Sequence, residues 1–327
     1  MILVITHKRD MHGAHMLDLL RRRGEVALAL DYETYPQQLE ISSYSGSHGE
    51  QLRFRFSDGT VVVSSDVKSV LNRRQGEIKA PDNFYEPRIA DYIVRESRQF
   101  LDALPQMLSC FWLSDPDAVR IASRKPCQLM VAKRLGFLTP LTITTNSPAE
   151  TEKFVTAAQR DIACKALWTP GITLEREGGE VGITLYTRRL KPSDVIGSIS
   201  SVKNCPMIFQ EYIEKAFELR ITVVGKQVFA CAIHSQESSR AREDWRRYDL
   251  ANTPHEQYEL PADIKEKCVQ LVADLGLQFG CIDMIVTPAG DYVFLEINAN
   301  GQWLWIEHIT KMPISEAIIE LLVNPPG

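Results

Sequence analysis

The 327-residue sequence predicts a mixed α/β protein, in part α+β, with more than one domain. Three observations support this class. The chain opens with a strand–helix–strand pattern, which is typical of a parallel α/β unit. Its last third contains short apolar runs separated by turn residues, which predict antiparallel hairpins. The hydrophobic content of 44% and the charged content of 24% are typical of globular proteins.

The N-terminal section, residues 1–118, contains the strand–helix–strand unit and is expected to form a domain. Its pattern predicts, in chain order, a strand at 2–6, a helix at 10–23, a strand at 26–30, a hairpin with strands at 51–56 and 61–64, and a helix over much of 86–107. No Gly-x-Gly-x-x-Gly follows the first strand, which excludes the usual dinucleotide-binding fingerprint.

Two further sections, residues 119–205 and 206–327, are expected to form a central and a C-terminal domain. The central section predicts a helix at 122–135, a strand at 141–144, a helix beginning at Ser147-Pro148, a strand at 162–167 and a hairpin over 173–187. The C-terminal section predicts strands at 207–212, 218–224 and 227–234, a helix at 262–275, a hairpin over 283–298 and a helix at 314–322. The polar segment 235–260 is long for a connection, which is typical of functional or mobile loops.

Composition excludes several classes of protein. The formal net charge of −5 gives no overall footprint for nucleic acid. The seven cysteines are scattered and never in Cys-x-x-Cys spacing, which argues against a disulfide framework and against a zinc site. The first residues are too few for a signal peptide, and no apolar run approaches the roughly 20 residues that cross a bilayer. We therefore expect a cytoplasmic protein that binds neither membranes nor nucleic acid.

The most informative segment is the predicted hairpin around Pro288-Ala289-Gly290-Asp291. Six residues outward from its centre on either side lie Asp283 and Glu296. Directly opposed residues of antiparallel strands have Cβ atoms about 5 Å apart, and Asn298 falls on the same face as Glu296. The pattern therefore predicts two carboxylates and an amide at one place among apolar neighbours.

Two carboxylates this close in an apolar setting require a positive partner. Oxygen ligands without histidine or thiolate suit Mg²⁺, which commonly binds together with phosphates. Asp283, Glu296 and Asn298 are therefore candidate Mg²⁺ ligands. A solvent-facing hairpin with polar ends explains the carboxylates equally well at this point.

Two lysines are candidates for phosphate binding, since the chain has no Gly-x-x-x-x-Gly-Lys-[Ser/Thr] motif. Lys165 is a lone cation in an apolar strand and must find an anion there or face solvent from an edge strand. Lys125 lies at the start of a predicted helix, where a cation and the helix N-terminus could both face phosphate. A surface lysine is the alternative at that position.

A third group of candidates lies between the two predicted strands that surround residue 214. The run Gln210-Glu211-Tyr212-Ile213 ends the first strand. Glu218 and Arg220 alternate with apolar residues, so both point to one face of the second. An acid that can bind ribose hydroxyls beside an arginine that can reach a phosphate fits a nucleotide site; a cross-strand salt bridge also explains the pair.

In this order, these residues resemble the motifs of the ATP-grasp superfamily, and most closely those of the peptide ligases of microviridin and related graspetide biosynthesis. The matching segments are Phe217-Glu-Leu-Arg-Ile-Thr-Val-Val-Gly225, Asp244-Trp245-Arg246, Ile282-Asp-Met-Ile-Val-Thr-Pro288, Tyr292-Val-Phe-Leu-Glu-Ile-Asn298 and Pro313-Ile314-Ser315-Glu316-Ala317-Ile318. The resemblance implies an ATP-grasp fold with an N-terminal pre-ATP-grasp α/β domain, a central domain and a C-terminal antiparallel-sheet domain.

The resemblance also implies roles for residues. Lys125 and Lys165 would contact the phosphates of ATP, residues 211–213 with Gln210 would form the adenine hinge, and Glu218 would hold the ribose. Arg220 would stabilise the transferring phosphoryl group. Arg246 would hold the acyl-phosphate or the carboxylate being activated. Asp283, Glu296 and Asn298 would bind the Mg²⁺ ions that bridge the phosphates.

The implied reaction is ATP-dependent ligation within a precursor peptide that has a leader and a core. Phosphorylation of an Asp or Glu side chain would give an acyl-phosphate, and a Ser or Thr hydroxyl or a Lys amine would close an ω-ester or ω-amide ring. The resemblance favours a homodimer. It places leader binding near the 173–187 hairpin and residues 192–201, where Arg188-Arg189 and Lys191 could suit an acidic leader.

Two alternative functions remain open. One is a RimK-like ligase that adds amino acids or glutamate to a carboxylate, and the other is a non-catalytic ATP-grasp module that binds peptide.

The sequence departs from the family pattern at two places. One is Asn72-Arg73-Arg74, where relatives often have an aromatic residue before the arginines, and the other is Ala299, where relatives often have proline after Glu-Ile-Asn.

Overall fold

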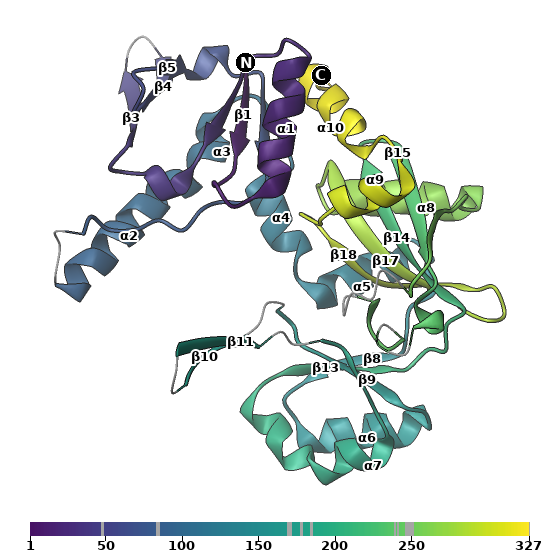
Figure 1. Cartoon of the computed structure of the whole chain (residues 1–327). Coiled ribbons are helices and arrows are strands. Elements are labelled where there is room, and N and C mark those ends of the chain that lie inside the picture. The colour runs from purple at the N-terminus through teal and green to yellow at the C-terminus, as the bar shows by residue number, and fades with distance from the viewer. Residues whose placement is uncertain are drawn as a thin grey trace.

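The computed structural model describes residues 1–46, 49–82, 86–168, 172–176, 179–183, 186–238, 240, 242–245 and 252–326. Within these ranges the strands form five sheets. Figure 1 shows a parallel N-terminal sheet beside the C-terminal sheet, with the central sheet on the other side of α5. This mixed arrangement confirms the predicted fold class. No helix in the described part of the chain has the length and apolar character needed to span a membrane.

The N-terminal unit is a four-stranded parallel sheet in the order β2-β1-β6-β7, joined to an antiparallel sheet in the order β3-β4-β5. Its elements are β1 (Ile2–Ile5), α1 (Met11–Arg22), β2 (Ala27–Leu30), β3 (Leu39–Gly46), β4 (Gly49–Phe56), β5 (Val61–Val63), β6 (Ser69–Asn72), α2 (Pro87–Asp102), α3 (Leu104–Met107) and β7 (Phe111–Leu113). The strand–helix–strand opening and the β4–β5 hairpin are as predicted. Strands β3, β6 and β7 were not predicted, and the predicted helix over 86–107 is two helices.

The central unit is a four-stranded antiparallel sheet in the order β12-β9-β13-β8, covered by helices, with a separate β10–β11 hairpin (Figure 1). Its elements are α4 (Pro116–Ala122), α5 (Lys125–Arg134), β8 (Thr142–Thr145), α6 (Pro148–Ala158), β9 (Ile162–Lys165), β10 (Ile172–Arg176), β11 (Gly179–Ile183), β12 (Arg188–Leu190), α7 (Pro192–Gly197) and β13 (Met207–Glu211). Ser147 caps α6 as predicted, since its side chain accepts a hydrogen bond from the Glu150 amide. Because β13 pairs with β8 and β9, the boundary proposed near residue 205 is better placed after Glu211.

The C-terminal unit is a five-stranded antiparallel sheet in the order β16-β15-β14-β17-β18. Its elements are β14 (Phe217–Val224), β15 (Gln227–Ile233), β16 (His255–Gln257), α8 (Ala262–Asp274), β17 (Phe279–Val286), β18 (Tyr292–Asn298), α9 (Leu304–Thr310) and α10 (Ile314–Val323). Helix α8 packs against one face of the sheet, where Ile264, Cys268 and Leu271 are buried. Short helix α9 and strand β16 were not predicted.

The N-terminal and C-terminal units share a hydrophobic core. Ile2 and Val4 of β1 are fully buried in one cluster with Ile318 and Leu322 of α10. The Ser69 hydroxyl of β6 donates a hydrogen bond to the Leu322 carbonyl at 2.7 Å, inside this contact. The N-terminal sheet is therefore part of the packing that supports the C-terminal sheet.

A neutral histidine joins α1 to the start of α9. The Nε2 atom of His12 accepts hydrogen bonds from the amides of Trp303 at 3.2 Å and Leu304 at 3.4 Å, and its ring packs edge-on against Trp303. Burial, assisted by the nearby Arg73 charge, lowers the pKa of His12 from 6.5 to about 3. The imidazole therefore remains neutral and serves as the N-terminal cap of α9.

This pKa predicts acid sensitivity. Below pH 6.5 the unfolded chain takes up a proton on His12 that the folded chain does not, so stability falls as the pH is lowered. Between pH 7 and pH 5 the His12 contribution to the loss is about 2 kcal/mol. Urea unfolding of the wild type and of His12→Gln at both pH values measures it. An equal pH dependence in the two proteins would contradict the neutral-cap role.

Candidate active site

The hairpin of β17 and β18 places Asp283 directly opposite Glu296, as predicted. The register is not uniform along the hairpin. Next to the turn Ile285 faces Val293, and a β-bulge at Leu295 then shifts the pairing by one residue so that Asp283 meets Glu296. The prediction placed the centre of the turn between Ala289 and Gly290, whereas the observed turn is centred on Ala289. The bulge adds one residue to β18, so the predicted pair of Asp283 and Glu296 is nevertheless correct.

Both carboxylates are shielded from solvent. The side chains of Asp283 and Glu296 are only 9% and 12% exposed. Asn298 joins them, because its Nδ2 donates a hydrogen bond to Asp283 Oδ2 at 3.0 Å. The alternative of a solvent-facing hairpin is therefore wrong for these residues.

Arg220 is the positive partner of Asp283. It lies directly opposite Asp283 on the neighbouring strand β14, and its Nη1 donates to both carboxylate oxygens at 3.0 Å. Burial by itself would lower the pKa of Arg220, but the Asp283 carboxylate outweighs burial and raises it. The cross-strand salt bridge considered for Arg220 thus exists, and it lies at the predicted site.

Lys125 is the positive partner of Glu296. Its Nζ lies 2.9 Å from Glu296 Oε2, and both side chains are largely buried. Helix α5, which begins at Lys125, is fixed to β18 by Gln128. The Gln128 side chain accepts a hydrogen bond from the Ile297 amide at 3.1 Å and donates one to the Ile297 carbonyl at 2.9 Å. This anchor positions Lys125 over the hairpin and excludes the surface-lysine alternative.

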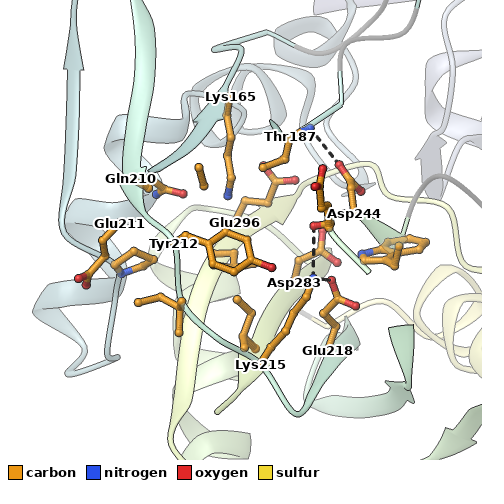
Figure 2. Close-up of a pocket in the computed structure, with 17 residues that line it drawn as sticks. Lys165, Thr187, Gln210, Glu211, Tyr212, Lys215, Glu218, Asp244, Asp283 and Glu296 are labelled. Atoms are coloured by element: carbon orange, nitrogen blue, oxygen red, sulfur yellow. Dashed lines mark hydrogen bonds and ion pairs between the residues drawn. The ribbon is translucent and has the colours of Figure 1, made fainter. Parts of the chain in front are cut away.

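A cavity between the central and C-terminal sheets brings most of the candidates together (Figure 2). From the central unit and the segment that follows it, the cavity is lined by Pro140, Ala163, Lys165, Thr187, Gln210, Glu211, Tyr212, Ile213 and Lys215. From the C-terminal unit it is lined by Glu218, Glu243, Asp244, Trp245, Asp283, Ile285, Leu295 and Glu296. The cavity therefore has cations and carboxylates on its walls and apolar side chains between them.

Lys165 does not face solvent from an edge strand. Its strand β9 lies between β12 and β13, and Lys165 pairs in register with Ile208. In Figure 2 the Lys165 side chain extends into the cavity from the central unit. The edge-strand alternative for Lys165 is therefore wrong.

The segment 210–213, which lines the cavity, is fixed through its backbone. The Glu211 amide donates to the Leu141 carbonyl at 3.0 Å and the Tyr212 amide donates to the Asp161 carbonyl at 2.7 Å. The Gln210 side chain donates to the Thr142 hydroxyl at 3.0 Å. A segment held at such fixed positions suits a hinge that contacts a flat base.

Glu218 is held by Lys215, a residue for which no role was predicted. Lys215 Nζ pairs with Glu218 Oε1, and the two side chains are 4% and 7% exposed. Burial raises the pKa of Glu218, and the Lys215 charge opposes that rise. The i, i+3 spacing of the two residues was visible in the sequence, but nothing there showed that the lysine is buried.

The polar segment contributes Asp244 and Trp245 to the cavity wall. Asp244 Oδ2 accepts a hydrogen bond from the Thr187 amide at 3.1 Å, which links this segment to the central unit. Trp245 packs against Trp305, with ring centroids 5.1 Å apart, and lies 5.7 Å from the Arg220 guanidinium. Arg246, the remaining candidate, lies outside the described residues.

The donor set fits Mg²⁺ in its chemistry. Asp283 and Glu296 supply carboxylate oxygens, and Asn298 can supply its amide oxygen. Within the described residues no group of three His, Cys, Asp or Glu side chains could hold a metal by itself. Two carboxylates and an amide suit an ion that completes its coordination with water and phosphate oxygens.

Gly301 packs closely against Arg220, the arginine that pairs with Asp283. A Cβ atom there would lie 2.5 Å from Cys281 Cβ and 2.8 Å from Arg220 Nη2, so neither neighbour can stay in place. We expect Gly301→Ala to destabilise the protein by about 1–3 kcal/mol and to reduce turnover by displacing Arg220. Gly46→Ala, at the end of β3, is the matched control, since nothing lies within 4 Å of the added atom. Urea unfolding and turnover measure both, and wild-type values for Gly301→Ala would contradict this packing.

Comparison with known proteins identifies the fold. Residues 1–120 match the family model described as the MvdD pre-ATP grasp domain, and residues 129–322 match the RimK-like ATP-grasp domain. The second match covers more than half of the 327-residue chain. The chain belongs to the RimK-like ATP-grasp family. It is therefore an ATP-grasp ligase, as the resemblance implied. No curated protein matched the chain.

Three solved structures of related enzymes are similar to this chain over nearly its whole length. Macrocyclase MdnC of Microcystis aeruginosa MRC, solved with its precursor peptide MdnA, is 32% identical over 100% of both chains, with a TM-score of 0.86. A RiPP-associated ATP-grasp ligase of Chryseobacterium gregarium, solved with ADP and a leader and core peptide, is 29% identical over 100% of this chain and 97% of its own, with a TM-score of 0.87. Macrocyclase MdnB of Microcystis aeruginosa MRC is 28% identical over 99% of both chains, with a TM-score of 0.79. The ligase is thus similar to peptide macrocyclases over its full length.

The two segments in which this ATP-grasp ligase departs from the family pattern contact each other through Asn300. Asn300, directly after Ala299, donates from Nδ2 to the Asn72 carbonyl at 3.3 Å. Arg73 is 1% exposed, and its Nη1 donates to Asn300 Oδ1 at 2.5 Å and to the Asn300 carbonyl at 2.8 Å. Asn72 and Asn300 therefore form a partly buried polar contact between the N-terminal sheet and the segment after the hairpin.

Proposed function

We propose that this ATP-grasp ligase closes macrocycles in a ribosomally made precursor peptide by joining Asp or Glu side chains to Ser, Thr or Lys side chains. The observation that carries the proposal is the full-length similarity to a peptide macrocyclase, at 32% identity. The cavity supports it, because Lys125, Lys165 and Arg220 supply positive charge beside the two carboxylates. No serine–histidine or cysteine–histidine nucleophile is needed for this chemistry.

The reaction has two steps. A side-chain carboxylate of the peptide attacks the γ-phosphorus of ATP, which gives an acyl-phosphate and releases ADP. A hydroxyl or amine of the same peptide then attacks the acyl carbon, so that the bond to phosphate breaks and the nucleophile loses its proton. The products are an ω-ester or ω-amide ring and inorganic phosphate. Such a reaction depends mainly on positioning and charge neutralisation.

We assign the residues that line the cavity, and those that contact its two carboxylates, to these steps. Lys125 and Lys165 would hold the phosphates of ATP, and Arg220 would stabilise the transferring phosphoryl group. Asp283, Glu296 and Asn298 would hold Mg²⁺, which when bound neutralises charge on the phosphates. The adenine would lie against Gln210, Glu211, Tyr212 and Ile213, and the ribose against Glu218, all of which line the cavity.

Arg246 completes the proposal as the residue that holds the carboxylate to be activated. It follows directly on Trp245, which lines the cavity and packs beside Arg220. Substituting Arg246 with lysine is expected to raise the KM for peptide while leaving the Kd for ATP within about twofold. An unchanged KM for peptide would remove this assignment.

We also propose how the ligase binds its peptide, where it acts and how it assembles. The precursor peptide would bind through its leader near the β10–β11 hairpin and α7, and the enzyme would act as a cytoplasmic homodimer. Of the basic residues considered for an acidic leader, Arg189 already pairs with Asp161 and Glu214. Sedimentation of the purified chain tests the dimer, and a crosslinkable leader peptide tests the leader site.

A RimK-like amino-acid ligase is the second candidate, since the matched family model is RimK-like. The two functions differ in the mass of their products. Ring closure removes one water molecule per bond from the peptide, whereas ligation of an amino acid adds its residue mass. Incubation of the purified ligase with ATP, Mg²⁺ and the precursor peptide from a neighbouring reading frame, with and without free glutamate, separates them. Mass gain with glutamate and no water loss from the peptide would favour the second function.

A further inference from the structure

Arg189, on strand β12, contacts the segment that lines the adenine end of the cavity. Its Nε donates to Asp161 Oδ2 at 2.6 Å and its Nη2 donates to Glu214 Oε1 at 2.8 Å. Its Cζ lies 4.1 Å from the centroid of the Tyr212 ring. One guanidinium therefore binds the residue before β9, the residue after the hinge and the aromatic side chain between them.

Tyr212 is the part of this arrangement that reaches the cavity. It lines the cavity together with Glu211 and Ile213, and Figure 2 shows its side chain among the labelled residues there. Its amide donates to the Asp161 carbonyl at 2.7 Å, so Asp161 contacts both Tyr212 and Arg189. The backbone of Tyr212 is thus fixed by Asp161, and its ring is held by Arg189, which itself binds Asp161.

The geometry requires the planar fork of arginine. Two nitrogen atoms of the guanidinium bind two different carboxylates while its carbon lies within cation–π distance of the ring. A lysine ammonium is a point charge and cannot bind two separated acids and cover an aromatic ring at once. The next residue along the strand, Arg188, is exposed and points to the opposite face of β12.

We infer that Arg189 is a positioning residue for nucleotide binding, because it holds the Tyr212 hinge in the conformation that receives the adenine base. The inference rests on the proposed function, since it assigns the adenine to this end of the cavity. Arg189 would then act on the affinity for ATP through Tyr212 and would have no direct part in the transfer of the phosphoryl group. It is accordingly not a site for an acidic leader.

Calorimetric titration of the full chain with ATP and Mg²⁺, without peptide, tests the inference. We expect Arg189→Ala to weaken ATP binding about tenfold and Arg189→Lys about fivefold, while the control Arg188→Ala stays within about twofold. In a Tyr212→Leu background, Arg189→Ala should add no more than about a twofold loss. With peptide present, the KM for ATP should rise about tenfold in Arg189→Ala while kcat stays within about twofold.

Three results would overturn the role of Arg189 without contradicting the proposed function. Binding within twofold of the wild type in Arg189→Lys and Arg189→Ala would overturn the inference. So would a tenfold loss that persists in the Tyr212→Leu background, or an equal loss in Arg188→Ala. If Arg189→Ala does not fold, Arg189→Lys decides, since it preserves the charge. Absence of ATP binding by the wild type would instead refute the nucleotide site itself, and this inference with it.

Discussion

Replacing Arg220 with alanine is expected to reduce turnover by at least about 10³-fold, since a guanidinium that stabilises a transferring phosphoryl group commonly contributes this much. The same change is expected to destabilise the protein by about 3–5 kcal/mol, because it leaves the buried Asp283 carboxylate without its cation. ADP release with peptide measures the first effect, and urea unfolding measures the second.

Two controls separate catalysis from stability. Arg220→Lys keeps a positive charge beside Asp283, so it should recover most of the stability while turnover stays about 100-fold below the wild type. Arg134→Ala removes an ion pair with Asp274 whose arginine is 67% exposed, and it should cost less than about 1 kcal/mol with normal turnover. Wild-type turnover in Arg220→Lys would show that only the charge of residue 220 matters.

Replacing Glu296 with glutamine is expected to abolish ring formation while the fold remains intact. The substitution preserves the shape of the side chain but removes the charge that faces Lys125 at 2.9 Å and that would bind Mg²⁺. We expect turnover to fall by at least about 100-fold and the Mg²⁺ concentration for half-maximal ATP binding to rise. Calorimetry and mass spectrometry of the peptide measure the two effects.

Glu320→Gln is the matched control for this change, because Glu320 lies on the exposed surface of α10. It should leave turnover and Mg²⁺ dependence unchanged. Cyclisation at the wild-type rate by Glu296→Gln would show that Glu296 does not bind the metal. Loss of folded structure in Glu296→Gln would instead show that its pairing with Lys125 is structural.

The part of the site that lies in one hairpin was predictable from the sequence. The pairing of Asp283 with Glu296 could be predicted from the turn residues and the two-residue period of a strand. The bulge at Leu295 could not be predicted. The common face of Glu218 and Arg220 followed from the same period. Local rules of this kind need only the order of residues along two neighbouring strands.

Contacts between distant segments were not predictable in this way. The pairing of Lys125 with Glu296 depends on Gln128 holding α5 against β18, and nothing in the pattern of either segment indicates that contact. The pairing of Arg220 with Asp283 depends on β14 lying beside β17. The assignment of β13 to the C-terminal section failed for the same reason, because its partners β8 and β9 lie far earlier in the chain.

Short strands and helices were also missed for a physical reason. Strand β7 spans only Phe111–Leu113, and β6 consists of four buried residues, so neither shows an alternating pattern. Their positions are set by pairing with β1 and with each other in the parallel sheet. Such strands are recognised only after the sheet that contains them is known.

The most direct test of the proposed function is the mass of a precursor peptide after incubation with the purified ligase, ATP and Mg²⁺. The peptide would come from a short neighbouring reading frame rich in Thr, Ser or Lys with paired Glu or Asp. We predict the loss of one water molecule for each ring and the release of one ADP for each water lost, with hydroxide cleaving the rings that are esters. An unchanged peptide mass, with ATP bound and the leader intact, would contradict the proposed function.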